Sequence, residues 1–135
     1  MSATLLALLG FLALTLALLV LMEVIRSWLV LTGKVQANGF HPDNAGLSPF
    51  MQRLARAHAN CLEGLPLFGG FMLVAVVADM TQHTDPLATV LLAARIAQTA
   101  IHLASTSSIA VMARFAAFAV QLVIATTWAI KLLSG

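Results

Sequence analysis

The sequence predicts an all-α integral membrane protein, built as a bundle of four transmembrane helices. Its 135 residues are 61% hydrophobic and only 9% charged, whereas soluble domains are about half apolar and about a quarter charged. Because a membrane-spanning helix needs about 20 apolar residues, a chain of this length holds about four crossings. We therefore expect a single domain over residues 1–135, with helices at about 3–31, 49–80, 86–106 and 110–133.

The same composition excludes several other classes of protein. Disordered chains are poor in apolar residues and rich in charge, and Cys61, the only cysteine, cannot form a disulfide framework. A net charge of +2 from seven Lys and Arg residues gives no nucleic-acid-binding surface, so no nucleic-acid partner is expected. His41 and His83 fall in predicted loops without the paired spacing of metal ligands, so we expect no metal site.

The first predicted helix contains an apolar run from Leu5 to Met22. A secretory signal has a basic segment before a shorter apolar core and a small-residue cleavage site after it. This run has neither flank, so we interpret it as a retained membrane helix. Its end, residues 23–28, is amphipathic, and Trp28 suits an interfacial anchor.

A polar segment from Thr32 to Pro49, rich in Gly, Asn, Pro, His and Asp, predicts a long loop, which we call loop 1. The second helix is expected to begin near Pro49, with Ser48 as its N-cap. It should continue to about Met80.

The remaining connections are short. Residues 81–86 form a tight connection in which Asp85 is a candidate N-cap before Pro86. The polar run Ser105–Ser108 predicts the break between the third and fourth helices, which we call loop 3, and the fourth helix should end at about Leu133.

The distribution of positive charge predicts the orientation in the membrane. Cytoplasmic loops carry an excess of Lys and Arg. Lys131 is the one basic residue expected on the side of the termini, and the opposite side carries Arg26, Lys34, Arg53, Arg56 and Arg114. We therefore expect loops 1 and 3 in the cytoplasm and both termini on the other side, in a membrane that the brevity and the Ala and Leu content suggest is a bacterial inner membrane.

The second helix contains charge where a membrane span should have none. Only residues 64–78 are uninterrupted by charge, too few to cross about 30 Å of hydrocarbon at about 1.5 Å per residue. The span must therefore include Asn60 and Glu63. Together with Arg53 and Arg56 these residues follow spacings of 3, 4 and 3, which place them on one face of the helix.

Two more helices carry polar stripes. Their residues are Arg95, Gln98 and His102 in the third helix and Arg114, Phe118 and Gln121 in the fourth. At about 1.5 Å per residue, four side chains share one level near the cytoplasmic edge, namely Asn60, Glu63, His102 and Arg114. Arg95 should lie about 9 Å deeper than Glu63, so an ion pair between them requires helix tilt.

The stripes allow two interpretations. One is a cationic pocket for a small zwitterionic or dianionic ligand, with Arg56, Arg114 and Arg53 for carboxylates and Glu63 for an amine. The other is that Arg53 and Arg56 are ordinary interfacial arginines, while Asn60, Glu63, Arg95 and Gln98 form buried polar pairs that lock helices together. Both interpretations require the same stripe.

The run RLARAHANCLEGLPLF, residues 53–68, resembles the second-helix signature of the MAPEG family, the membrane-associated proteins in eicosanoid and glutathione metabolism. The family pattern is R-x-x-R-A-x-x-N-x-x-E followed by a proline. It is filled here by Arg53, Arg56, Ala57, Asn60, Glu63 and Pro66. This local sequence is most similar to the branch of microsomal glutathione transferases and leukotriene C synthase. Chain length and the number of helices also fit the family, so the resemblance covers the whole chain.

The resemblance implies a homotrimer in membrane lipid, with glutathione sites between neighbouring subunits. Family members conjugate glutathione, a co-substrate, to lipophilic electrophiles, reduce lipid hydroperoxides or isomerise lipid endoperoxides. The implied glutathione-binding residues are Arg53, Arg56, Asn60, Glu63, Arg95, Gln98 and His102. Arg114 is implied as the catalytic arginine that polarises the thiol, aided by the positive end of the fourth helix dipole.

The chain also departs from the family pattern. It contains no tyrosine, so the hydroxyl groups that relatives supply from the third and fourth helices are absent. Phe118 cannot replace them, although His102 can donate a hydrogen bond. The leading hypothesis is a glutathione transferase or peroxidase, and a non-catalytic protein that binds lipid or a partner stays open. A small transporter that uses Glu63 is the third hypothesis.

Overall fold

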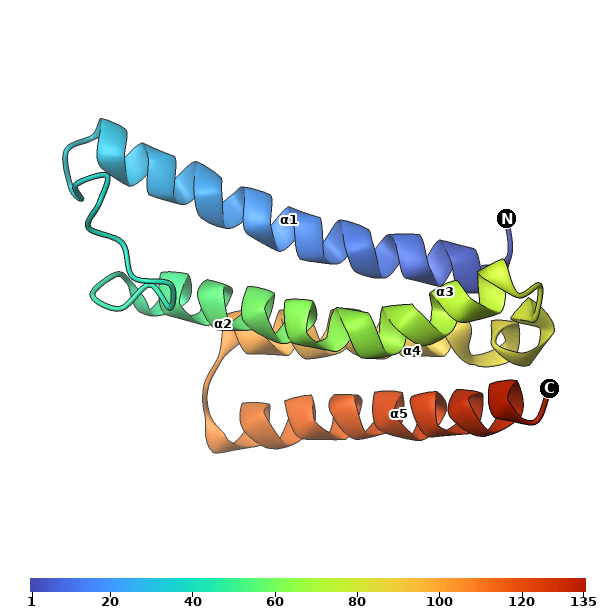
Figure 1. Cartoon of the computed structure of the whole chain (residues 1–135). Coiled ribbons are helices and arrows are strands. Elements are labelled where there is room, and N and C mark those ends of the chain that lie inside the picture. Colours follow the sequence, from blue (N-terminus) through green and yellow to red (C-terminus); the bar gives the residue numbers. More distant parts are fainter.

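The computed structural model describes residues 1–135 and contains only helices and their connections. Four helical stretches are long and apolar enough to cross a membrane, and they lie alongside one another in a bundle (Figure 1). The predicted fold class, an all-α membrane protein with four spans, is confirmed. Loops 1 and 3 lie at one end of the bundle, here called the loop end, and both termini lie at the other, the terminal end.

Helix α1 spans Ala3–Leu31. Ser2 caps it, because the Ser2 hydroxyl accepts a hydrogen bond from the Leu5 amide over 3.1 Å. A Cβ atom at Gly10 would come within 2.6 Å of the Leu92 side chain, so glycine at this position allows α1 to approach α4 closely.

The second span is continuous but not uniform. Helix α2 covers Pro49–Gly64, a π-helical turn follows at Leu65–Gly69, and α3 covers Gly70–Val77. Pro66 has no N–H to donate to the preceding turn, and a wider turn absorbs this defect. The span ends at Val77, earlier than the expected Met80, because Asp79 adopts a left-handed conformation with φ of 55°.

The predicted N-cap at Ser48 is present, and the predicted one at Asp85 is wrong. The Ser48 hydroxyl accepts from the Met51 amide over 3.2 Å. Asp85 is instead the first residue of α4, Asp85–Ala104. Its carboxylate accepts from the backbone N–H and the hydroxyl of Thr4 over 2.9 and 2.6 Å, so a contact with α1 replaces the local cap.

The break between the last two helices is shorter than expected. Helix α4 ends at Ala104, not 106, and α5 covers Ser108–Leu133 instead of starting at 110. Ser107 explains the early start of α5, because its hydroxyl accepts from the Ala110 amide over 3.2 Å.

The interior has two apolar clusters. The cluster nearer the terminal end includes Phe11, Phe68, Met72, Leu91 and Trp128. The one nearer the loop end includes Leu18, Met22, Met51, Leu54 and Cys61. On α4, the buried residues Arg95 and Gln98 come directly after Ala88 and Leu91, which belong to the cluster nearer the terminal end. A polar layer thus occupies part of the bundle interior.

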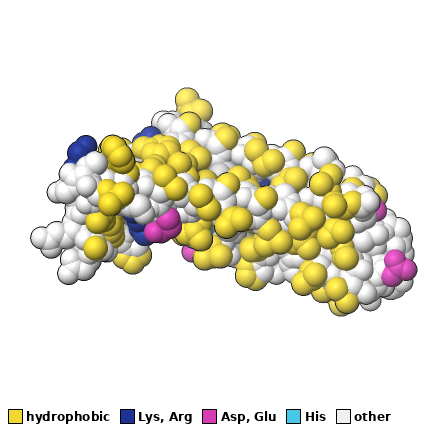
Figure 2. Space-filling model, turned by 90° about the horizontal axis from the view of Figure 1, so that it is seen from above, with side chains coloured by type: hydrophobic (Ala, Val, Ile, Leu, Met, Phe, Trp, Pro, Cys, Tyr) yellow, Lys and Arg dark blue, Asp and Glu magenta, His cyan; other side chains and the backbone are white.

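The outer surface suits a bilayer. In the face shown in Figure 2, hydrophobic side chains cover the middle, and most charged side chains lie toward the two ends. Trp28, expected as an interfacial anchor, is 62% exposed near the end of α1. An exposed apolar surface of this extent is stable in lipid rather than in water.

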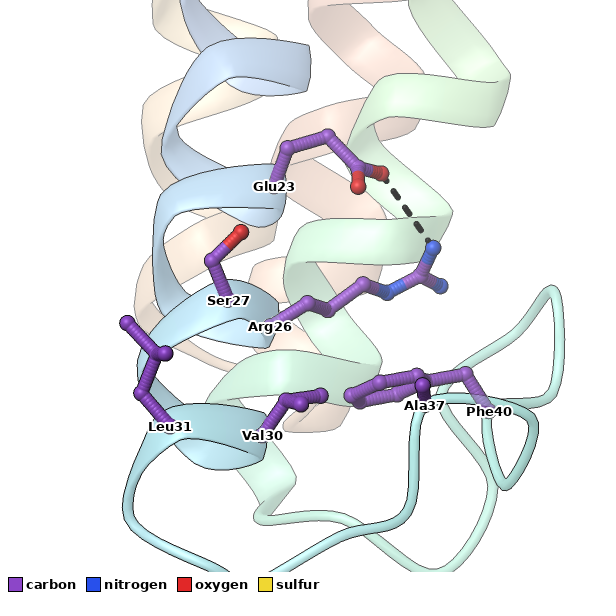
Figure 3. Close-up of a pocket in the computed structure, with 7 residues that line it drawn as sticks. All are labelled: Glu23, Arg26, Ser27, Val30, Leu31, Ala37 and Phe40. Carbon is purple, nitrogen blue, oxygen red and sulfur yellow. Dashed lines mark hydrogen bonds and ion pairs between the residues drawn. The ribbon is translucent and has the colours of Figure 1, made fainter.

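Loop 1 is fixed to the bundle by a buried asparagine. Asn44 Oδ1 accepts from Arg26 Nε and Nη2 over 3.0 and 2.6 Å, and Asn44 Nδ2 donates to the Met51 carbonyl over 2.7 Å. Arg26 also forms the one ion pair of the chain, with Glu23 at 3.3 Å. Figure 3 shows this pair beside a groove of about 540 Å³, to which α1 and loop 1 both contribute side chains.

Candidate functional site

A polar pocket of about 280 Å³ lies toward the loop end, where α2, α4 and α5 meet. Its lining residues are Arg56, Ala59, Asn60 and Glu63 from α2, His102 from α4 and Arg114 from α5. The helical rise placed four of these side chains at one level, and the structure brings those four together around one cavity.

Two charged side chains of α2 reach the pocket without any partner in the chain. Arg56 and Glu63 are exposed, and neither takes part in the ion pair of the chain, which joins Arg26 and Glu23. The Glu63–Arg95 pair that would have required tilt is not formed. Both charges therefore stay available to a ligand or to a second chain.

Behind the pocket, a closed ring of hydrogen bonds joins α2, α4 and α5. Arg95 Nη1 donates to Asn60 Oδ1 over 2.8 Å, and Arg95 Nε donates to Gln121 Oε1 over 2.9 Å. Gln98 closes the ring, because its Nε2 donates to Asn60 Oδ1 over 3.1 Å and its Oε1 accepts from Gln121 Nε2 over 2.8 Å. These four residues form the amide ring.

Arg95 is fully buried in this ring without a carboxylate beside it. Its guanidinium carbon lies 5.0 Å from the centre of the Phe11 ring and 5.5 Å from that of Phe68. Aromatic faces attract cations most strongly away from water. Two amide oxygens accept from Nε and Nη1, the two rings face the guanidinium, and Nη2 is buried without a hydrogen-bond partner.

Gly64 allows this arrangement. A Cβ atom there would lie 2.9 Å from Arg95 Nη2 and 3.3 Å from the Phe68 ring. A larger residue would push the guanidinium away from α2. Glycine at position 64 thus leaves room for the Arg95 guanidinium beside α2.

His102 of α4 and Arg114 of α5 supply the rest of the pocket lining. His102 is almost fully buried, and Arg114 is half-buried, with its Nε shielded from solvent and without a hydrogen-bond partner in the chain. The expectation that the helix dipole aids Arg114 is wrong. Helix α5 begins at Ser108, so Arg114 lies beyond the first turn, where the dipole effect falls off.

Arg53 does not line the pocket. Its Nε donates to the Leu103 carbonyl over 2.8 Å, one of the carbonyl groups that the C-terminal turn of a helix leaves unpaired. Arg53 thus holds the start of α2 against the end of α4. The polar stripes thus contain two kinds of residue. Arg53, Arg95 and Gln98 are engaged in contacts between helices, whereas Arg56 and Glu63 have no partner in the chain.

The sequence did not single out Gln121 as a site residue, although it lies on the polar stripe of the fourth helix. Its spacing of seven from Arg114 was the available signal. Two basic residues near the end of α1 lie outside the pocket. Lys34 is exposed in loop 1, and Arg26 is engaged by Asn44 and Glu23.

The pocket offers hydrogen-bond donors and positive charge on most of its wall, with one carboxylate. Guanidinium groups bind carboxylates with two parallel hydrogen bonds, and a carboxylate binds an ammonium group. The arrangement suits a small ligand with acidic groups and one amine.

Comparison with known proteins gives one match. The model of the MAPEG family matches residues 4–134. Neither the curated proteins nor the solved structures gave a match.

Proposed function

The chain belongs to the MAPEG family of membrane proteins, and on this premise we propose that it is a membrane-bound glutathione-dependent transferase or peroxidase. The family includes glutathione transferases and related enzymes, and also non-catalytic members. The observation that carries the proposal is the pocket in which Arg56, Glu63 and Arg114 converge without partners from their own chain.

Glutathione matches the charges of this pocket. It carries two carboxylates and one ammonium group besides its thiol. Arg56 of α2 and Arg114 of α5 supply guanidinium groups, and Glu63 supplies a carboxylate for the ammonium group. In this proposal Arg95 and Gln98 act from behind the pocket through Asn60, and Arg53 acts by holding α2 in place.

The proposed chemistry is stabilisation of the thiolate. A free thiol has a pKa of about 8.5, and a nearby guanidinium lowers it, which raises the nucleophilic fraction at neutral pH. Arg114 is the candidate for this role, with His102 as a neighbouring hydrogen-bond donor. In the transferase reaction the thiolate sulfur bonds to an electrophilic carbon, and the leaving group departs with the bonding electron pair.

The lipophilic second substrate, an electrophile or a lipid hydroperoxide, is proposed to enter from the bilayer. We further propose that the protein is a homotrimer whose pocket is completed by a neighbouring copy, because Arg56 and Glu63 are exposed in the single chain. Loops 1 and 3 are proposed to face the cytoplasm, where glutathione is supplied, in a bacterial inner membrane.

The proposal is tested with the full chain purified in detergent. Glutathione binding is measured by calorimetry, and turnover by conjugation of glutathione to chlorodinitrobenzene. The ultraviolet thiolate absorbance that appears on adding glutathione is compared between wild type and Arg114→Ala. Absence of both binding and turnover would overturn the proposal.

One observation favours a second candidate, a non-catalytic protein that binds lipid or a partner. The chain has no tyrosine, and no hydroxyl-bearing side chain lines the pocket. This candidate predicts glutathione or lipid binding without turnover, and no effect of Arg114→Ala on any measured activity.

A further inference from the structure

The amide ring has only one consistent polarity. Arginine carries hydrogen-bond donors and no acceptor, so the atoms of Asn60 and Gln121 that face Arg95 must be carbonyl oxygens. The Gln121 nitrogen then faces Gln98, which must accept through its own oxygen. The nitrogen of Gln98 is left to donate to Asn60, whose oxygen already faces Arg95. Both directions around the ring give the same assignment.

This polarity decides what Asn60 offers to the pocket. Asn60 is the one member of the ring that lines the cavity, and its oxygen already accepts two hydrogen bonds from inside the bundle. Its N–H₂ group has no partner in the chain and is the group left for a ligand. The side-chain amide of an asparagine without such partners can rotate by about 180° and present either its oxygen or its nitrogen to a ligand.

Gln121 is the distant member of the ring. It is fully buried on α5 and does not line the pocket, so any influence on a ligand must pass through other side chains. Its Nε2 also donates to the Ala117 carbonyl over 3.1 Å, one turn earlier on its own helix. With three hydrogen bonds satisfied, the Gln121 amide is held in one orientation.

We propose that Gln121 is a positioning residue: by accepting from Arg95 and donating to Gln98 it orients both donors to Asn60 Oδ1. It thereby holds the N–H₂ group of Asn60 toward the pocket and restricts this subsite to an acceptor group of the ligand. A carboxylate or amide carbonyl oxygen fits, and an amine does not. This inference rests on the proposed function for the identity of the ligand, glutathione. The subsite thereby separates the acidic parts of glutathione from its ammonium group, for which Glu63 is the acceptor.

Three substitutions test the relay by calorimetric titration of the full chain in detergent with glutathione. Gln121→Glu keeps an acceptor for Arg95 but removes the donor to Gln98, and Gln121→Met removes both without adding charge. Asn60→Asp replaces the N–H₂ group with an oxygen that cannot donate. Each variant is expected to raise the glutathione Kd about tenfold or more, the effect of losing one hydrogen bond to a charged group.

The double variant Asn60→Asp with Gln121→Glu gives the decisive comparison. If Gln121 acts through Asn60, the second substitution adds little to the first, and the double variant binds about as weakly as Asn60→Asp alone. If Gln121 acts by charge or by general stability, the two effects multiply. Gln52→Glu is the matched control, because Gln52 is exposed and bonds only to the Leu47 carbonyl, outside the ring. Its Kd should equal that of wild type.

The outcomes separate this inference from the proposed function. No glutathione binding by wild type overturns both. Wild-type binding together with unchanged Kd for Gln121→Met, or with multiplicative effects in the double variant, overturns the relay alone. Thermal unfolding in the same detergent identifies a variant that has lost its fold. If one Gln121 variant is lost in this way, the glutathione Kd of the other tests the relay. The pH at which bound thiol ionises should stay unchanged in Gln121→Met, since Arg114 is assigned that role.

Discussion

Arg95 Nη1 lies 2.8 Å from Asn60 Oδ1, and this contact ties a buried cation of α4 to a neutral amide at the edge of the pocket. A buried charge is costly unless it is hydrogen-bonded or paired. Because Asn60 and Gln121 supply the acceptors, Glu63 is not required as a counter-ion. The one carboxylate of the pocket is therefore left for a ligand.

The first prediction concerns Arg114. Arg114→Ala should lower kcat for glutathione conjugation about 10²-fold, the loss typical when one electrostatic stabiliser of a reacting anion is removed. The thiolate absorbance of bound glutathione at neutral pH should fall in parallel. Lys131→Ala, which removes an exposed cation near the far end of the same helix, is the control. Undiminished thiolate absorbance in Arg114→Ala would contradict the assigned role.

Glu63→Gln tests the assignment of the amine. The substitution keeps the size of the side chain and removes its charge, so the glutathione Kd should rise about tenfold. A glutathione analogue without the γ-glutamyl amine should bind wild type and variant equally, and unequal binding would contradict the assignment. If Glu63 instead serves transport, the variant would abolish proton-coupled uptake into vesicles, which the wild type would then have to show.

The two glycines Gly64 and Gly70 form a matched pair. Gly64→Ala should destabilise the protein by about 1–3 kcal/mol and weaken glutathione binding, because its Cβ would lie 2.9 Å from Arg95 Nη2. Gly70→Ala meets nothing within 4 Å and should be neutral or stabilise the helix by up to about 1 kcal/mol. Thermal unfolding in detergent measures both, and equal effects would contradict the close packing of Arg95 on Gly64.

Thr4→Val removes a buried hydroxyl that bonds Thr84 and Asp85. It should cost about 1–3 kcal/mol in the free energy of unfolding. Glutathione binding should not change, because the contact lies at the terminal end and the pocket toward the loop end. Thr126→Val is the control, since its exposed hydroxyl bonds only to the Leu122 carbonyl of its own helix. An equally small effect of both substitutions would show that the contact contributes nothing.

The sequence allowed the fold class and the level of the pocket residues to be predicted. Helix number follows from apolar runs, and the depth of Glu63, His102 and Arg114 follows from a constant rise per residue. Neither prediction depends on how the helices pack against one another. The chemical roles of the pocket residues stay predictions.

Contacts between helices could not be predicted in the same way. The pairing of Arg95 with Asn60 instead of Glu63 depends on helix tilt and on the glycine beside them, which spacing along one helix does not encode. Asp85 shows the same limit, because a rule for local caps cannot anticipate that Thr4, 81 residues earlier, uses its carboxylate.

That contact also has a consequence for biosynthesis. The backbone N–H of Thr4 belongs to the first turn of α1, which has no partner within its own helix, and its acceptor enters the membrane two crossings later. Inserted helices associate after they span the bilayer, so this hydrogen bond to the start of α1 forms only when α4 arrives. The third crossing thus completes the polar contacts that hold the start of the first crossing at the terminal end.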